Sequence, residues 1–516
     1  MKGQLSLLIG LLAIAVNISG CSGSDKQHMD ARDSSYKSGG CETVMTTYTE
    51  TEAEGLEIYN ELFKFENKVS INIIMTQAEI NKLQTDYQKY YQTDVNKKSD
   101  VYRKADVIFN IGGKGYTVRE VGVRLKGNTS FAPFYDDYGN PNICNFKLSF
   151  DETFDDKDDY GADVKEWGSA AERKARKKRT FATLNELDIK WNADYDETNI
   201  REIYATKLFE AVDSPVQKIG LSQLMINGNN YGLVKIYEPV DKKFLEKRLP
   251  ESALGGDLYK CMWSECDNNG SRTGNWRGAT YKTDNSYGIQ KNPEGIRYNL
   301  NLKTNKKTSN HESLINFLNV VNKQDITKDE LERVLDVDSY ANFMAAEYFA
   351  GNPDDIRNNF NNHYIYFRKD NGKAIFIVYD NDHTLGLTYG MDINCAVIDP
   401  YSDTAAIAGS QENPLIKNTL THEPLPSLSY VRDKYTAALK KLSETEMLAS
   451  DDDFNKMYNI AKFNYKDIID PYIIFANQEW RFEFSLAGQN NSRTTMNAPF
   501  EQFRSQIMDT YKSSKP

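Results

Sequence analysis

The sequence predicts an α+β protein with two lobes, a strand-rich N-terminal lobe and a mainly helical C-terminal lobe. Up to about residue 240, most structured segments alternate apolar and polar residues, which is typical of strands, and two helices are expected among them, at 76–91 and 198–212. After about residue 410, apolar residues recur at helical spacing instead. A chain that places strands first and helices later favours an α+β architecture.

The first predicted elements are a strand, a helix and three further strands. Residues 76–91 are expected to form the helix, because Thr76 and Glu79 have the spacing of a capping box. Glycines at 112, 113 and 115 predict a turn between two of the strands. The expected strands are Lys68–Met75, Ala105–Ile111, Thr117–Leu125 and Asn145–Phe150.

Two hairpins and several helices are predicted further along the chain. The first hairpin joins Ile219–Ile226 to Tyr231–Glu238 through Asn-Gly, which accepts positive φ. The second joins His363–Arg368 to Ala374–Tyr379 through Lys-Asp-Asn-Gly. The expected helices are Thr198–Val212, Asp338–Ala350 with Asp338 as its cap and Gly351 at its end, Tyr430–Leu448 and Phe454–Tyr465.

A long charged insertion separates the predicted strands of the first lobe. Residues 151–163 are acidic and residues 173–179 are basic, so we expect one charged loop. The basic run suits either an acidic substrate or, as we prefer, a solvated face.

The N-terminus predicts export and a lipid anchor. Lys2 precedes the apolar run Leu5–Val16, which is too short to span a bilayer well and is typical of a signal peptide. The residues before Cys21 resemble the lipobox of bacterial lipoproteins, so we expect a lipid on Cys21 at the extracytoplasmic face of the membrane. The expected organisation is a signal peptide at 1–20, a polar flexible tether at 21–65, an N-lobe at 66–240 and a C-lobe at 241–516.

Composition excludes some classes of partner. The net charge of -11 argues against nucleic acid as the main partner. No later segment approaches 18 consecutive apolar residues, so the rest of the chain is expected to be soluble. The five cysteines after Cys21 do not have the spacing of a zinc site or a disulfide scaffold. Cys261 and Cys266 either pair or remain buried thiols.

Several common chemistries lack their motifs. The sequence contains no HExxH, GxSxG or CxxC. The glycine turn is not a P-loop, because Ile108 stands at the first glycine position and Lys114 precedes Gly instead of Ser or Thr.

One set of polar residues suits phosphoryl transfer. A loop that contains both Asp354 and Asp355 follows a predicted helix, and a hairpin is expected to bring Asn362 close to Asp380. In phosphoryl transfer one carboxylate orients or deprotonates the attacking hydroxyl, while an Asn and a second Asp hold Mg²⁺ against the phosphates. Two alternatives stay open: Asx residues enrich loops in general, and Asp380 with Asp382 suits a structural Ca²⁺ site.

At these residues the chain resembles the CotH (spore coat protein H) kinase family, whose members are atypical, protein-kinase-like, two-lobed folds. The resemblance runs in order over most of residues 69–440. Its motifs are Val121–Ser130, Lys147, Leu184–Asp188, Ile200–Glu202, Met225–Leu233, Leu258–Lys260, Gly351–Asp354, Asn362–Tyr366 and Tyr379–Asp382.

The resemblance implies a role for each matching residue. Asp354 would be the catalytic aspartate, although Asp355 adjoins it, and Tyr379 stands where the family commonly has Trp. The metal ligands would be Asn362, Asp380 and, in support, Asp382. The nucleotide-binding residues would be Lys147, paired with Glu202; Arg124 or Lys126 as alternative phosphate contacts; Glu238 at the hinge; and Tyr379, packed on adenine or on the metal loop.

The implied function is transfer of the ATP γ-phosphoryl group to Ser or Thr of exported or cell-surface proteins. The cofactors would be ATP and Mg²⁺, with Mn²⁺ or Ca²⁺ as alternative metals. The rival interpretation is a non-enzymatic lipoprotein, either a pseudokinase scaffold or an adhesion or carbohydrate-binding protein, which the 32 tyrosines and many asparagines suit.

Overall fold

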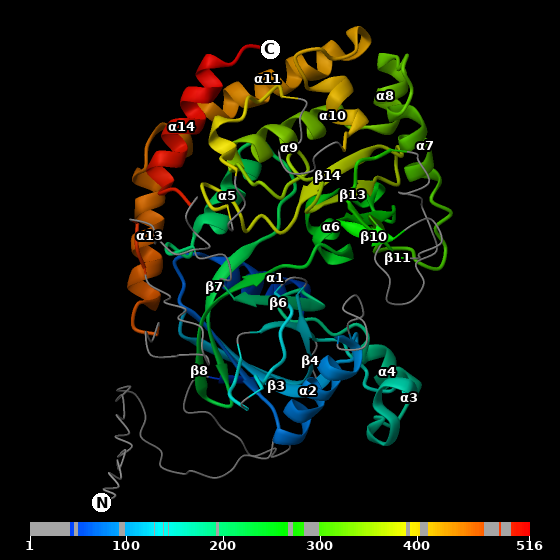
Figure 1. Cartoon of the computed structure of the whole chain (residues 1–516). Coiled ribbons are helices and arrows are strands. Elements are labelled where there is room, and N and C mark those ends of the chain that lie inside the picture. The colour runs from blue at the N-terminus through cyan, green and yellow to red at the C-terminus, as the bar shows by residue number, and fades with distance from the viewer. Residues whose placement is uncertain are drawn as a thin grey trace, which may run out of the picture.

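A strand-rich part and a mainly helical part lie one above the other in the computed structural model (Figure 1). The structure describes residues 42–45, 50–91, 99–127, 130–137, 139–142, 144–191, 196–266, 272–282, 299–388, 393–402, 411–468, 484–486 and 497–516. The signal peptide, Cys21 and the start of the predicted tether lie outside these residues.

The strand-rich part is a closed barrel. In the described part of the chain, seven strands follow one another in the order β4-β3-β2-β7-β8-β6-β5, and β5 pairs back with β4. These strands are β2 (Val69–Ile74), β3 (Arg103–Ile111), β4 (Lys114–Lys126), β5 (Asn145–Ser149), β6 (Glu186–Trp191), β7 (Ile219–Ile226) and β8 (Asn229–Tyr237). A short strand, β1 (Glu42–Met45), adds to β4 in parallel.

The length of β4 explains the closure. Lys114–Val123 pairs with β3, and Gly122–Lys126 pairs with β5, so one strand joins both edges of the sheet. The α+β prediction is confirmed. A closed barrel is not a typical kinase N-lobe, however, and a kinase-like two-lobed fold stays a prediction.

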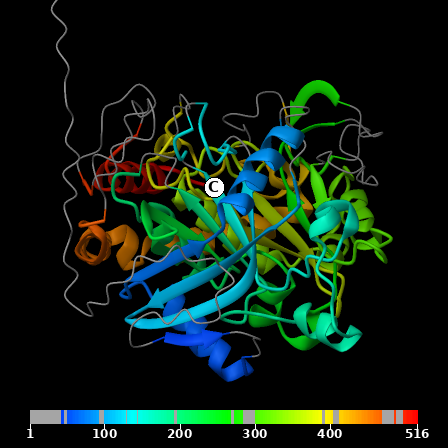
Figure 2. The same cartoon turned by 90° about the horizontal axis from the view of Figure 1, so that it is seen from below.

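Two helices lie against the barrel, on opposite sides of its blue and cyan strands when seen from below (Figure 2). Helix α2 (Gln77–Tyr91) confirms the predicted helix, and Thr76 caps it by accepting a bond from the Glu79 amide at 3.2 Å. Helix α1 (Glu52–Phe63) was not predicted. Its apolar face, including Leu62, is buried in the barrel core. The expectation that the tether continues to residue 65 is therefore wrong.

The charged insertion is partly helical and partly buried, so the expectation of one charged loop is wrong. It contains α3 (Lys157–Tyr160), the 3₁₀ helix η1 (Gly161–Asp163) and α4 (Ala170–Arg176). Arg176 and Arg179 are buried and donate to the Glu120 carbonyl oxygen. Glu120 lies in an irregularity of the β3–β4 ladder, where the register gives it no partner residue on β3. The preferred solvated face is therefore wrong for these two arginines, while the lysines at 174, 177 and 178 are exposed.

The helical part surrounds a second sheet. Its strand order is β12-β9-β13-β14, with β9 (Leu258–Cys261), β12 (Leu300–Leu302), β13 (His363–Phe367) and β14 (Ala374–Val378), and β10 (Ser264–Cys266) pairs separately with β11 (Arg272–Arg277). The helices are α5 (Arg201–Glu210), α6 (Lys242–Arg248), α7 (Glu312–Val321), α8 (Lys328–Val334), α9 (Val337–Ala350), α10 (Pro414–Thr419), α11 (Ser429–Ser443), α12 (Glu446–Ala449), α13 (Asp452–Tyr465) and α14 (Phe500–Ser513), with the 3₁₀ helices η2 (Glu251–Ala253), η3 (Cys395–Val397) and η4 (Pro426–Leu428).

Helix α9 lies at the centre of the helical part and ends where the candidate site begins. Its side chains are buried almost throughout, and it packs against α5, α11 and β14. Gly351 ends it with φ of 64°, as predicted. Both predicted hairpins are confirmed, because β7 pairs with β8 and β13 with β14.

Tyr465 joins the two parts through its hydroxyl group. This residue ends α13, yet its hydroxyl accepts a bond from the Val69 amide and donates to the Leu221 carbonyl oxygen, each at 2.9 Å. A helix near the C-terminus therefore holds the barrel strands β2 and β7.

The N-terminal cap of α9 is Asp336, and the prediction of Asp338 is wrong. The Asp336 side chain accepts a bond from the Ser339 amide at 3.1 Å, whereas Asp338 pairs with Lys434 on the surface. We expect Asp336→Ala to lower the free energy of unfolding by about 1 kcal/mol, because an orphan amide loses its acceptor. Asp338→Ala should change it by less than about 0.5 kcal/mol. Urea unfolding of both variants measures the difference, and equal losses would contradict the assignment.

The cysteines of the described residues are free thiols where their side chains are placed. Cys144, Cys261 and Cys395 are buried and unpaired, so pairing of Cys261 is wrong and the buried-thiol alternative holds for it. Among the described residues, no helix has the length and apolar character needed to cross a bilayer.

Candidate functional site

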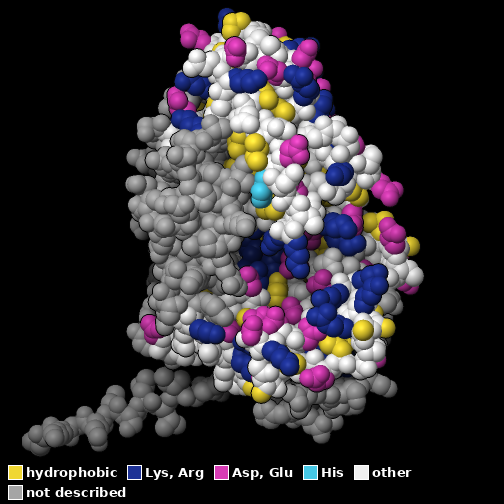
Figure 3. Space-filling view, turned by 90° about the vertical axis from the view of Figure 1, so that its right-hand side faces the viewer, with side chains coloured by type: hydrophobic (Ala, Val, Ile, Leu, Met, Phe, Trp, Pro, Cys, Tyr) yellow, Lys and Arg dark blue, Asp and Glu magenta, His cyan; other side chains and the backbone are white. Residues whose placement is uncertain are grey.

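The outer wall of the barrel presents a row of charged side chains to the helical part. Alternate residues of β4, β5, β6 and β8 fill the barrel core, so the residues between them point outward. Strand register places Arg124 beside Lys147 and Lys147 beside Asp188. The outward polar residues are Arg124, Lys126, Asn145, Lys147, Glu186, Asp188, Lys190, Lys235 and Tyr237. Lysine and arginine side chains gather in a hollow between the two parts (Figure 3).

Lys126 and Lys147 share Asp188. The Asp188 carboxylate lies 2.6 Å from the Lys126 ammonium and 3.3 Å from that of Lys147. Burial alone would raise the pKa of Asp188, but these two charges outweigh it and hold the pKa well below its usual range. Lys147 also contacts Glu186 at 2.7 Å. The wall therefore carries more positive than negative charge before any ligand binds.

The predicted pairing of Lys147 with Glu202 is wrong. Glu202 lies in the first turn of α5 and is 1% exposed. It accepts bonds from Lys235 at 3.0 Å and from the Tyr237 hydroxyl at 2.6 Å. Both partners come from β8. Lys147 lies on β5, and β6 separates these two strands in the sheet. Lys235 is therefore the lysine that pairs with the helix.

Glu238 and Arg124 are engaged by protein groups. Glu238 is fully buried, and its carboxylate contacts Arg248 at 2.5 Å and Lys247 at 3.7 Å. These contacts join Glu238, just after β8, to the end of α6, so the nucleotide contact expected of the Glu238 side chain is not supported. The Arg124 guanidinium lies 5.2 Å from the ring centre of Tyr102, at the rim of the wall.

Across from the wall, the loop after α9 holds Asp354 in a nest of side-chain amides. The Asp354 carboxylate accepts bonds from Asn359, from Asn361 at 3.0 Å and from Asn362 at 2.9 Å. Burial raises its pKa, and the bonds from Asn359 and Asn361 oppose that rise. Asp354 and Asn362 are therefore in direct contact, as a shared site requires.

The neighbouring Asp355 has a different environment. Its carboxylate is 1% exposed and accepts bonds from the backbone amides of Arg357 and Asn358 at 2.8 and 2.7 Å. Burial raises the pKa of Asp355 to about 7. The buried Asp355 side chain therefore stabilises its own turn, and Asp354 is the carboxylate at the partly exposed position.

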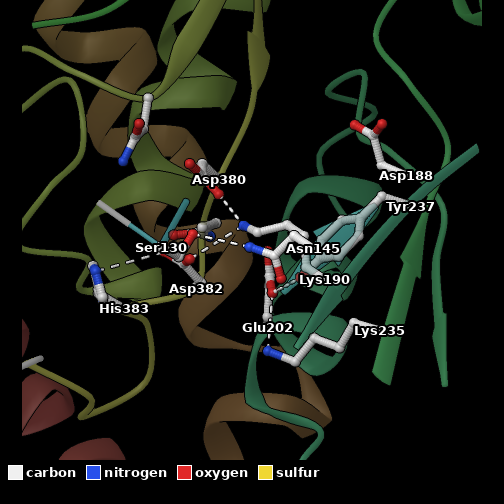
Figure 4. Close-up of polar contacts among 12 residues, drawn as sticks. Ser130, Asn145, Asp188, Lys190, Glu202, Lys235, Tyr237, Asp380, Asp382 and His383 are labelled. Atoms are coloured by element: carbon white, nitrogen blue, oxygen red, sulfur yellow. Dashed lines mark hydrogen bonds and ion pairs between the residues drawn. The ribbon is translucent and has the colours of Figure 1, made fainter. Parts of the chain in front are cut away.

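Asp380 and Asp382 follow β14 and meet a lysine from the barrel. The hairpin brings them to the Asp354 loop, because the Tyr379 amide donates to the Asn362 carbonyl oxygen at 3.2 Å. Lys190 extends from β6 toward both carboxylates (Figure 4). Its ammonium group contacts Asp380 directly and lies 3.2 Å from Asp382. Although burial opposes it, the charge of Lys190 holds the pKa of Asp380 well below its usual range.

Lys190 is a site residue that the sequence did not lead us to expect, as are Lys235, Asn359 and Asn361. The signal for Lys190 was the alternation Glu186-Leu-Asp188-Ile-Lys190, which is typical of a strand with one charged face. The resemblance to the family implied Lys147 as the lysine of the site instead.

The two acidic loops are fastened together at the end of α9. The Ala350 carbonyl oxygen accepts bonds from the Thr384 hydroxyl at 2.7 Å and from the Leu385 amide at 2.8 Å. The side-chain amide of Asn352 donates a hydrogen bond to the side-chain oxygen of Asn381 at 2.7 Å. These bonds fix Asp354 relative to Asp380 and Asp382.

Tyr379 lies next to Asp380, at the end of β14. Its ring meets Tyr364 edge-on at 5.2 Å, and the Lys260 ammonium lies 4.0 Å from the ring centre. Its expected contact with adenine stays a prediction.

The donor set suits a hard divalent cation. Asp380, Asp382 and the Asn362 amide supply oxygen ligands of the kind that Mg²⁺ prefers and that Ca²⁺ also accepts. Lys190 places a positive charge between the two carboxylates, which is where such a cation would bind. In the part of the chain that the structure describes, no three His, Cys, Asp or Glu side chains converge on a metal site, so an ion here would depend on the amide as well.

Comparison with known proteins identifies the family. A family model described as CotH kinase protein matches residues 147–484, nearly two thirds of the chain. The matched range contains every acidic residue of the site and Lys190, whereas Arg124 and Lys126 precede it. Among curated proteins, none matches this sequence. On the evidence of that match, the chain belongs to the CotH kinase protein family.

Proposed function

We propose that the protein is an ATP- and Mg²⁺-dependent kinase that phosphorylates Ser or Thr of exported or cell-surface proteins. The observation that carries the proposal is the meeting of Asp354, Asn362, Asp380 and Asp382 opposite a wall of lysines. Phosphoryl transfer requires positioning and charge neutralisation above all, and this arrangement supplies both.

Asp354 is the proposed acceptor of the hydroxyl proton. The amides of Asn359, Asn361 and Asn362 hold its carboxylate in one orientation. Burial raises its pKa, which makes the carboxylate a stronger base than an exposed aspartate. Because Asp355 is buried and bonded to its own turn, it is the weaker candidate for this role.

The proposed metal ligands are Asp380 and Asp382 with Asn362. A bound Mg²⁺ or Mn²⁺ would neutralise negative charge on the phosphates. Lys126, Lys147 and Lys190 lie on the same outer wall, where their ammonium groups suit phosphate oxygens.

We further propose that Cys21 anchors the protein by a lipid to the extracytoplasmic face of the membrane. A tether that ends before β1 limits the reach of the site, so the expected substrates lie on the same surface. The source of ATP there would be exported nucleotide, or the reaction would precede completion of export.

The test is metal-dependent phosphate transfer by the full chain. We expect wild-type protein to incorporate label from γ-labelled ATP, into itself or into surface proteins, only with Mg²⁺ or Mn²⁺. Asp380→Ala should weaken metal and nucleotide binding together by at least about tenfold, because it removes a charged ligand. Calorimetric titration measures both affinities.

Asp370→Ala is the matched control. Asp370 lies in the exposed turn between β13 and β14, where it pairs with Arg368. This variant should bind metal and nucleotide like the wild type. Unchanged titrations for Asp380→Ala would contradict the metal role, and wild-type protein without nucleotide binding would favour the scaffold alternative.

A further inference from the structure

Lys190 occupies the place of a cation between two carboxylates. Its ammonium group contacts Asp380 and lies 3.2 Å from Asp382. Its side chain is 15% exposed, and its ammonium group lies over the ring of Tyr237, 5.1 Å from the ring centre. Lys190 belongs to the barrel, whereas both carboxylates belong to the helical part, so this contact joins the two parts (Figure 4).

We infer that Lys190 is a displaceable counter-cation, which holds Asp380 and Asp382 together until a divalent metal takes its place. The inference rests on the proposed function, because it concerns the same metal site. It assigns Lys190 a role in the order of binding: metal must compete with this lysine, and the released lysine becomes available to phosphate.

Charge balance supports the competition. Asp380 and Asp382 both lie beside the Lys190 ammonium group, so their carboxylates are close enough to repel, and the positive charge offsets part of that repulsion. The Lys190 ammonium group and a divalent cation would bind the same carboxylate oxygen atoms. Only one of them can therefore occupy the space between Asp380 and Asp382. Lys190 therefore stabilises the metal-free site and lowers its apparent affinity for metal.

The surroundings of Lys190 indicate where its charge would act after displacement. Lys126 and Lys147 lie on neighbouring strands of the same wall and already share Asp188. Among the described residues of this wall, Glu186 supplies the remaining carboxylate, which Lys147 contacts. A third ammonium released toward this cluster would leave it with excess positive charge. A bound phosphate would relieve that excess, so metal and phosphate should favour each other's binding.

Binding of Mn²⁺ alone tests the first half of the inference. Electron paramagnetic resonance measures free Mn²⁺ during titration of the full chain without nucleotide. We expect Lys190→Met to bind Mn²⁺ on the order of tenfold more tightly than the wild type, because the competing charge is gone. The same variant should bind inorganic triphosphate more weakly in the presence of Mn²⁺.

Lys147→Met is the matched control. It removes one positive charge from the same wall, but its partners are Glu186 and Asp188 instead of the proposed metal ligands. Its affinity for Mn²⁺ should change by less than about twofold. An equal or weaker affinity in Lys190→Met, or a gain of the same size in Lys147→Met, would overturn the inference.

A second measurement uses wild-type protein, so it does not depend on folding of a variant. Lys190 should resist acetylation by an amine-reactive reagent without metal and react faster when Mn²⁺ is added, as measured by mass spectrometry of its peptide. Lys147 in the same sample should show no comparable increase. A rate for Lys190 that Mn²⁺ leaves unchanged would contradict displacement.

These outcomes are separable from those of the proposed kinase activity. Suppose that phosphate is transferred, but that Lys190→Met does not bind Mn²⁺ more tightly and Mn²⁺ does not speed acetylation of Lys190 in the wild type. The kinase proposal then stands and this inference fails. If Mn²⁺ displaces Lys190 but no phosphate is transferred to any protein, the inference stands and the kinase proposal fails. Absence of Mn²⁺ binding in both proteins contradicts the inference as well.

Discussion

Asp354→Asn is expected to slow phosphoryl transfer by about 10²- to 10⁴-fold while leaving the fold intact. Asparagine has nearly the shape of aspartate but cannot accept the proton of the attacking hydroxyl. It also replaces one carboxylate oxygen by an NH₂ group, which would face the amide donors of Asn359, Asn361 or Asn362. Single-turnover transfer of labelled phosphate measures the loss.

The binding properties of this variant separate chemistry from assembly. Asp380, Asp382 and Asn362 all remain in this variant, so its affinity for metal should fall by far less than its rate of transfer. Asp355→Asn is the matched control, because asparagine still accepts the bonds from the Arg357 and Asn358 amides. Loss of transfer in Asp355→Asn together with normal transfer in Asp354→Asn would show that the catalytic carboxylate is Asp355.

Lys235→Met is expected to lower the free energy of unfolding by about 3–5 kcal/mol. Lys235 and Glu202 are each 1% exposed and lie 3.0 Å apart, so removal of the lysine leaves a buried carboxylate without its counter-charge. Tyr237 still donates to Glu202 at 2.6 Å, but a neutral donor offsets only part of that loss. Urea unfolding monitored by circular dichroism gives the difference.

Two further variants identify the cause of that destabilisation. Adding Glu202→Leu to Lys235→Met should recover much of the stability, because no buried charge remains. Lys218→Met is the matched control: its partner Glu210 lies 2.6 Å away, but both side chains are more than 40% exposed. It should cost about 0–1 kcal/mol. Equal losses for the exposed and buried lysines would show that the pair is not the source.

The acidic half of the site could be predicted because its geometry is local. The hairpin β13–β14 returns the chain to its start, so Asn362 and the residues after β14 must lie together. Asp354 is close in sequence to Asn362, and one loop brings them into contact. Hairpin pairing and short loops are visible in sequence patterns.

The basic half could not be predicted because it depends on how a barrel closes. Whether Lys147 or Lys235 faces Glu202 is decided by strand order and by the placement of α5, and neither follows from spacing along the chain. Burial of Arg176 and Arg179 depends likewise on the carbonyl group of Glu120, which lies in an irregularity of the β3–β4 ladder. A basic run has the same sequence pattern whether it is solvated or satisfies such carbonyls.

Barrel closure has a practical consequence for fragments of the protein. The family match starts at Lys147, in β5, but β5 reaches ring closure by pairing with β4, which precedes it along with β2 and β3. A polypeptide that begins at Lys147 would expose unpaired strand edges, and Tyr465 would lose its partner at Val69. Such a fragment should aggregate instead of folding, so an expressed fragment should begin before α1. A protease that cuts within β2–β4 should open the barrel and make the rest of the protein sensitive to digestion.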